Sequence, residues 1–130
     1  MCGIAGVFNR GGDKVDPQLL VRMTRTLAHR GPDEEGYFLN GRTPSVWAQS
    51  DTTRYPTTRG AIDGGAGIVG LGHRRLAIID LSSGQQPLSN EDETVWVTFN
   101  GEIYNFQSLV AELEARGHRF RTRSRAIQSV

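Results

Sequence analysis

The chain has 130 residues, a formal net charge of +1 and an apolar fraction of 37%. This length suits a single domain with a modest hydrophobic core. No stretch of ~18 apolar residues occurs, and no secretory signal opens the chain, so we expect no membrane partner. A single cysteine excludes an internal disulfide framework and fits a reducing, cytoplasmic location.

The first residues, from Met1 to Phe8, contain that cysteine, Cys2. If Met1 is removed, Cys2 carries a thiol and a free α-amine. Thiols have a reference pKa near ~8.5 and α-amines near ~7.7–8.0, so the amine can act as the base near neutral pH. Residues 3–8 predict a buried strand, including Ile4, that fixes Cys2 in the interior. From spacing alone, the alternative is that Cys2 is an incidental terminal residue.

The next segments alternate between predicted helices, strands and polar loops. Asp16 and Pro17 predict the start of a helix over residues 17–28, because they provide an N-cap and a proline at the first position. Asn105 predicts the cap of a second helix, which Gly117 ends. A surface loop is expected over residues 40–65 and a polar loop over 82–92. Strands are predicted at 36–39, around 46–47, at 67–72, at 75–80 and, most clearly, at 94–99.

Three candidate sites have competing interpretations. The G-x-G-x-x-G at residues 65–70 runs into a strand rather than a helix, so we reject a dinucleotide site there. Asn100 and Gly101 predict either a hairpin turn or an oxyanion hole, since an Asn amide and a Gly N–H can both donate to negative charge. Arg74 and Arg75 predict either the charged end of a surface strand or an arginine that binds a carboxylate.

Other polar residues have simpler interpretations. Asp33 and Glu34 are expected in a turn, and the three histidines are too far apart in sequence for a metal motif, so we expect no metal site. The arginines between positions 116 and 125 predict a solvated face, and we expect no nucleic acid partner.

Five segments carry the strongest pattern. They read MCGIAG at 1–6, AHRGPD at 28–33, GHRRLAIIDL at 72–81, QPL at 86–88 and FNGEIYN at 99–105. Together they resemble the glutaminase domain of class II glutamine amidotransferases, specifically that of glutamine-hydrolysing asparagine synthetases. On this resemblance, residues 1–130 form a partial type 2 glutamine amidotransferase domain without the synthetase domain.

The resemblance implies an α+β fold, the αββα sandwich of antiparallel sheets of N-terminal-nucleophile hydrolases, incomplete at the C-terminus. Cys2 would attack the side-chain amide of glutamine and form a thioester. Asn100 and Gly101 would form the oxyanion hole, and Arg75 would bind the substrate carboxylate. The expected lining of the glutamine pocket is Leu76, Ala77, Ile78, Ile79, Asn100, Gly101 and Glu102.

The resemblance also sets expectations about cofactors and partners. No cofactor is expected in this chain, because ATP and Mg²⁺ would belong to the synthetase domain. The expected partners are glutamine and either a second copy of the chain or a separate synthetase domain. Arg125 stands where the family has an aspartate that holds the glutamine amino group. The alternative function is therefore a catalytically inactive, truncated remnant or a binding module of the same family.

Overall fold

Two antiparallel sheets and two helices form an α+β fold. The structure is a computed structural model that describes residues 1–41, 45–49, 67–76 and 85–120. The four-stranded sheet has the order β1-β4-β2-β3, and β5 pairs with β6 in a second sheet. In chain order the elements are β1 (Gly3–Phe8), α1 (Pro17–Arg25), β2 (Glu34–Leu39), β3 (Ser45–Gln49), β4 (Val69–Arg75), β5 (Leu88–Ser89), β6 (Trp96–Val97) and α2 (Phe106–Ala115).

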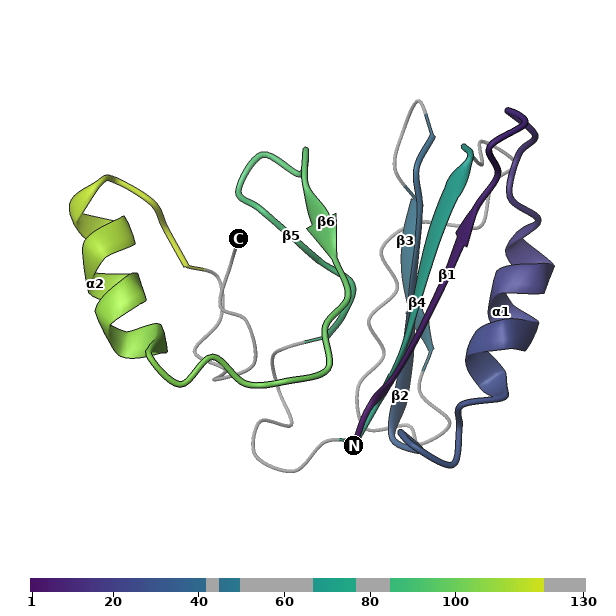
Figure 1. The fold of residues 1–130 in the computed structure, drawn as a ribbon, viewed down its shortest axis with the longest axis horizontal. Coiled ribbons are helices and arrows are strands. Elements are labelled where there is room, and N and C mark those ends of the chain that lie inside the picture. The colour runs from purple at the N-terminus through teal and green to yellow at the C-terminus, as the bar shows by residue number, and fades with distance from the viewer. Residues whose placement is uncertain (42–44, 50–66, 77–84, 121–130) are drawn as a thin grey trace.

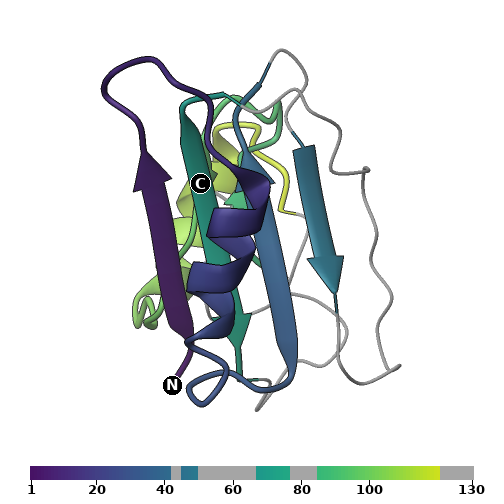
Figure 2. The same ribbon diagram turned by 90° about the vertical axis from the view of Figure 1, so that its right-hand side faces the viewer.

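The elements are stacked in layers (Figure 1). Helix α1 lies across one face of the four-stranded sheet, as the turned view shows (Figure 2). The β5–β6 pair lies on the opposite face, and α2 lies beyond it. Neither helix of the described ranges is long and apolar enough to span a membrane.

The core lies between α1 and the sheet. Leu20 is fully buried against Val15, Tyr37 and Leu39. The predicted N-cap is confirmed, because Asp16 Oδ1 accepts the main-chain N–H of Gln18 at 2.9 Å. The helix ends at Arg25, three residues before the predicted end at residue 28. After Arg25, hydrogen bonds between residues three apart, such as Ala28 N–H to Arg25 O at 3.1 Å, replace the α-helical pattern.

The two faces of β4 carry different side chains, because successive residues of a strand point to opposite sides. Gly70 and Gly72 lie beneath Leu20 and Thr24 of α1. Residues 73 and 75 therefore point toward β5 and β6, and a hydrogen bond of 2.9 Å between His73 Nδ1 and Thr98 Oγ1 agrees. Every site residue on β4 can be assigned to a face in this way.

The β5–β6 pair covers β2 and β4 but leaves β1 open on that side. Phe38 of β2 stacks on Trp96 of β6 with ring centroids 4.6 Å apart. Ile4 and Phe8 of β1 are 48% and 62% exposed. The prediction that β1 is wholly buried is therefore wrong for these two residues, since only the face of β1 toward α1 is covered.

The second sheet is shorter than its sequence predicts. Of the expected strand at 94–99, only Trp96–Val97 pairs as a strand, opposite Leu88–Ser89. The side chain of Asn90 accepts the N–H groups of Thr94 and Val95 at 2.9 and 3.0 Å, which holds those residues in a turn. Residues 102–105 form no strand, so the hairpin interpretation of Asn100 and Gly101 is wrong.

Several other predictions can be compared directly. Strand β4 runs from Val69 to Arg75 without the break predicted between 72 and 75, and the part of the second predicted strand at 77–80 lies outside the described residues. The strand around residues 46–47 is confirmed as β3. The second helix is confirmed, and Gly117 follows it with a φ of 96°. Asn105 precedes α2 but makes no side-chain capping bond, so that part of the prediction is wrong.

Candidate active site

The sheet register gathers several predicted site residues at one end of the four-stranded sheet. Gly3 lies opposite Arg74, and Glu34 lies opposite Arg75. Because the strands are antiparallel, the beginning of β1, the end of β4 and the beginning of β2 meet at this end. Cys2 precedes Gly3, so the same register places it beside Arg75. This is the lower end of the sheet, where the N-terminus lies (Figure 1).

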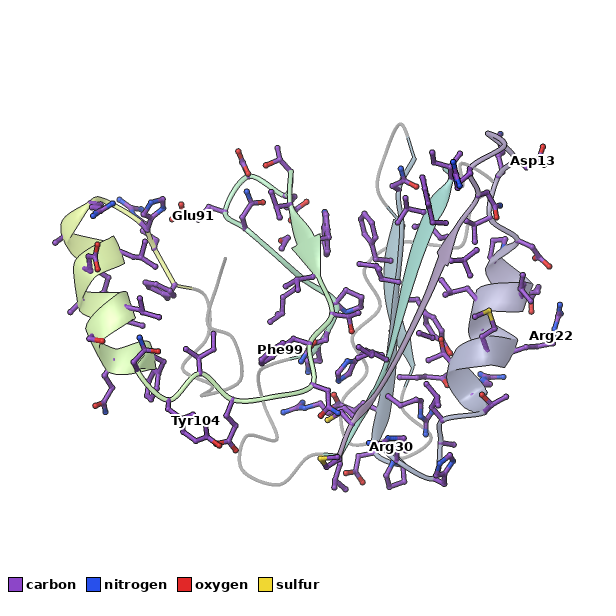
Figure 3. All side chains as sticks on the ribbon, in the orientation of Figure 1. Asp13, Arg22, Arg30, Glu91, Phe99 and Tyr104 are labelled. Carbon is purple, nitrogen blue, oxygen red and sulfur yellow. The ribbon has the colours of Figure 1, made fainter. Side chains whose placement is uncertain are left out.

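Cys2 is half-buried and is held from two sides. Its Sγ accepts the main-chain N–H of Leu76 at 3.4 Å. Its carbonyl oxygen accepts a hydrogen bond from Nε of Arg30 at 3.2 Å. Figure 3 shows Arg30 at the same end of the molecule, near the beginning of β1. The predicted nucleophile and the predicted pocket residue Leu76 are therefore in direct contact.

The two adjacent arginines of β4 lie on opposite faces of the sheet. Arg74 points toward α1, is 2% exposed, and donates to Glu35 Oε2 at 2.8 Å. It also donates to the carbonyl oxygens of Gly31 and Pro32 at 2.7 and 3.2 Å. Arg74 therefore holds the turn before β2 against the sheet, and the interpretation of a surface strand with charged ends is wrong.

Glu35 joins this arginine to helix α1. Arg25 donates Nη2 to Glu35 Oε1 at 2.8 Å, and Arg74 binds the other carboxylate oxygen. Burial alone would raise the pKa of Glu35, but the hydrogen bonds and charge of Arg25 and the charge of Arg74 outweigh it and lower the pKa. The carboxylate therefore stays ionised between the two arginines.

Arg75 lies on the face that Cys2 shares. A side chain at Gly3 would meet Leu27, which follows α1, so the preceding residue Cys2 points to the opposite face. Arg75 Nη1 donates to Glu34 Oε2 at 3.0 Å, and the two side chains are 10% and 8% exposed. Glu34 is thus the buried first residue of β2, so the prediction that it is a turn residue is wrong. Of the two arginines considered for binding a carboxylate, only Arg75 is on the side of the sheet where Cys2 lies.

A small cavity lies beside this pair. Its lining is Glu34, Glu35, Gly36, His73, Arg75, Gln85 and Gln86. Within the described ranges, Glu34 Oε1 and His73 Nε2 are buried and have no hydrogen-bond partner. Burial, and secondarily the charge of Arg75, lowers the pKa of His73 to about 4. At neutral pH His73 is therefore an uncharged imidazole beside a buried ion pair.

The predicted oxyanion residues follow β6. Asn100, Gly101 and Glu102 are all exposed. The chain that carries them descends from β6 toward the end of the molecule that holds the N-terminus (Figure 1). No hydrogen bond described here joins these residues to Cys2. Their attachment to the rest of the fold runs through the two residues before them, Thr98 and Phe99.

Some of the sequence predictions concern residues that the structure does not describe. Ala77, Ile78, Ile79 and Arg125 lie outside the described residues. Among the residues that are described, no group of three or more His, Cys, Asp or Glu side chains is arranged to hold a metal ion.

The comparison with protein families decides the relationship of the chain. A family model described as "Glutamine amidotransferase domain" matches residues 1–126. The chain belongs to this glutamine amidotransferase domain family.

The relatives of this domain include "Asparagine synthetase [glutamine-hydrolyzing] 1" from Bacillus subtilis (strain 168), which is 42% identical over 127 residues. The protein with the same description from Arabidopsis thaliana is 39% identical over 125 residues. Each match covers 95% of this chain but only 16% and 17% of the relative, so the chain spans about one sixth of their length. No solved structure matches the chain.

Sequence reasoning missed three polar residues that the structure places beside this site. Glu34, His73 and Gln86 are all buried. His73 and Gln86 lie within the segments GHRRLAIIDL and QPL, which carry the family resemblance, so membership in these segments could have marked them as candidates. Glu34 had no such signal, because its burial depends on the pairing of β2 with β4.

Proposed function

We propose that this chain is a glutaminase domain that hydrolyses glutamine to glutamate and ammonia through a thioester on Cys2. The shared face and shared end of Cys2 and Arg75 are the observation that carries this proposal. A nucleophile and a guanidinium are the two groups that an amino-acid amide substrate requires, one for the amide carbon and one for the remote carboxylate.

The proposed reaction begins after Met1 is removed. The α-amine of Cys2 takes the thiol proton, and Sγ bonds to the amide carbon. The oxygen of the tetrahedral intermediate receives hydrogen bonds from the Asn100 side chain and the Gly101 N–H. The amine then returns the proton to the departing nitrogen, the C–N bond breaks, and ammonia leaves. Water attacks the thioester, which releases glutamate and restores the thiol.

Binding of the substrate is assigned to Arg75 and to the residues after it. Glu34 holds one nitrogen of Arg75 at 3.0 Å and so limits the orientations that the guanidinium can adopt. Leu76 to Ile79 and Glu102 complete the pocket in this proposal. Because the carboxylate is remote from the reacting amide, Arg75 contributes mainly to binding rather than to the chemical step.

We infer that the layers belong to the αββα sandwich of N-terminal-nucleophile hydrolases. The order of α1, the four-stranded sheet, β5–β6 and α2 supports this inference (Figure 1). The relatives are named as asparagine synthetases, so we assign the use of the ammonia to an ATP- and Mg²⁺-dependent synthetase domain or partner. The region matched here corresponds to 16% and 17% of those relatives.

The test is ammonia release from glutamine, measured beside intact mass. We expect loss of Met1 from the purified protein, a transient mass increase of one glutamyl group, and ammonia release that Cys2→Ala abolishes. Because Cys2 is the only thiol in the chain, the glutamyl group can be located without ambiguity. A retained Met1, or ammonia release by Cys2→Ala, would contradict the proposal.

The same experiment addresses the alternative of a binding module. Alkylation of Cys2 by iodoacetamide reports glutamine binding, since a bound substrate protects the thiol. Protection by glutamine without ammonia release would favour a binding module over an enzyme. Arg125, which replaces the expected aspartate near the amino group, is the feature that makes this comparison necessary.

A further inference from the structure

Gln86 binds the main chain of the residue that precedes the proposed oxyanion donors. Gln86 as a whole residue is 8% exposed, and its side chain lies next to β6. The N–H of Phe99 donates to Gln86 Oε1 at 2.6 Å, and Gln86 Nε2 donates to the carbonyl oxygen of Phe99 at 2.9 Å. Both amide atoms of one side chain therefore bond both polar main-chain groups of one residue.

These side-chain hydrogen bonds extend the β5–β6 ladder beyond its last main-chain pair. Leu88 lies opposite Val97, and Ser89 lies opposite Trp96. The same register places Gln86 opposite Phe99, although neither residue belongs to a strand. The main chain of Gln86 instead lies against β2, where its carbonyl oxygen occupies the space that a side chain at Gly36 would need. The side-chain amide thus replaces the missing peptide partner of Phe99.

The position of Phe99 affects both residues that follow it. Its carbonyl group belongs to the peptide bond with Asn100, so the hydrogen bond from Gln86 Nε2 fixes the peptide plane from which Asn100 begins. The hydrogen bond to the Phe99 N–H fixes the preceding peptide plane. The ring of Phe99 also lies against Gly101, where an added side chain would overlap it. Figure 3 shows Phe99 on the side of the four-stranded sheet away from α1. Apart from this anchor, Asn100 and Gly101 are exposed.

We propose that Gln86 is the positioning residue of the oxyanion hole: it holds Phe99 so that Asn100 and Gly101 face the reacting amide. This inference rests on the proposed function. The role requires a side-chain amide at position 86, because the main chain of Phe99 needs one donor and one acceptor in the same plane. A carboxylate offers two acceptors, one of which would face the Phe99 carbonyl oxygen.

The decisive variant is Gln86→Glu, whose hydrogen bonding depends on its protonation. The ionised carboxylate cannot donate to Phe99, whereas a protonated carboxyl has one O–H donor and one acceptor. Burial, the facing carbonyl and the Glu34 carboxylate in the same cavity disfavour the ionised form. Arg75 favours it, but Glu34 already pairs with this guanidinium, and His73 in the same cavity is uncharged above its pKa of about 4. We therefore expect kcat at pH 8 to be about tenfold or more below that of the parent. This decrease is smaller than the 10²–10³-fold decrease in kcat that follows loss of a whole oxyanion donor. We expect this deficit to shrink as the pH is lowered toward 5.5.

Two further variants complete the experiment. Gln86→Met has similar length and no hydrogen bonds or charge, so its kcat should be low at every pH. Gln107→Glu makes the same chemical change at an exposed position of α2 and should match the parent. For each variant, kcat and KM are measured for ammonia release, and glutamine binding is measured by protection of Cys2 from iodoacetamide. We expect kcat to change and protection to stay within about threefold.

Specific outcomes overturn the inference. Unchanged kcat in folded Gln86→Met, a change confined to KM, or a Gln86→Glu deficit that is constant with pH would each do so. If circular dichroism shows both Gln86 variants unfolded, Gln86 serves the fold as a whole and not the position of Asn100. The proposed function fails separately, when the parent releases no ammonia or when Cys2→Ala still does.

Discussion

The buried imidazole of His73 should make the fold sensitive to mild acid. His73 is 1% exposed, and its pKa is lowered from 6.5 to about 4 by burial and by the charge of Arg75. Glu34, the partner of Arg75, lines the same cavity. Between these two pKa values the unfolded chain binds a proton at residue 73 that the folded chain does not. The free energy of unfolding therefore decreases as the pH falls through this window.

The size of the effect follows from the two pKa values. The full difference corresponds to about 3 kcal/mol, since a tenfold change in a protonation equilibrium is worth about 1.4 kcal/mol. Between pH 7 and pH 5 about 2 kcal/mol of this is lost. The pKa of Glu35 is lowered from its usual 4.5, so the stability that this carboxylate contributes is lost only at lower pH, outside the measured range.

Urea unfolding at pH 7, 6 and 5 measures this loss, with tryptophan fluorescence as the signal because Trp96 stacks on Phe38. The variant His73→Asn cannot titrate, and its amide can occupy the position of Nδ1 near Thr98. We expect its unfolding free energy to be nearly constant across this range. His29→Asn, at an exposed position, should keep the pH dependence of the parent. Equal losses in the parent and in His73→Asn would refute the argument.

Three further outcomes are expected. Asn100→Ala should lower kcat for ammonia release by about 10²–10³-fold with little change in glutamine protection of the thiol, because an oxyanion donor acts in the transition state; a change confined to KM would contradict this role. Arg75→Ala should raise KM and weaken glutamine protection more than it lowers kcat, as measured by the same two assays, and the reverse pattern would exclude carboxylate binding. Glu35→Gln should lower the unfolding free energy by about 3–5 kcal/mol in urea titrations, because it leaves two arginines without their shared carboxylate. Its control, Glu112→Gln, breaks an exposed pair with Arg116 and should cost about 0.5 kcal/mol or less.

Predictions from local sequence patterns succeeded where short-range contacts decide the structure. Helix α1 begins where Asp16 and Pro17 predict, because capping depends on a bond to Gln18 two residues away. They failed where distant segments compete for the same groups. The strand expected at 94–99 is short because side chains of Asn90 and Gln86 occupy main-chain groups at its two ends.

The faces of β1 show a second reason for failure. An apolar run predicts burial, but it does not say whether one or both faces of the strand are covered. Ile4 and Phe8 are exposed because the β5–β6 pair lies over β2 and β4 instead. Burial of this kind depends on which layer lies over which strand.

By itself the sequence determined the family, the nucleophile Cys2 and the Asn100–Gly101 pair as candidates, because these rest on residue chemistry and on motifs in a fixed order. Only the tertiary structure decided that Arg75, and not Arg74, shares a face with Cys2. It also decided that Glu34 and Gln86 are buried partners of this site. The physical reason is strand register, because a shift of one residue would exchange the two faces of β4. The register depends on pairing with strands that are distant in sequence, so the residues next to Arg75 in the chain do not determine its face.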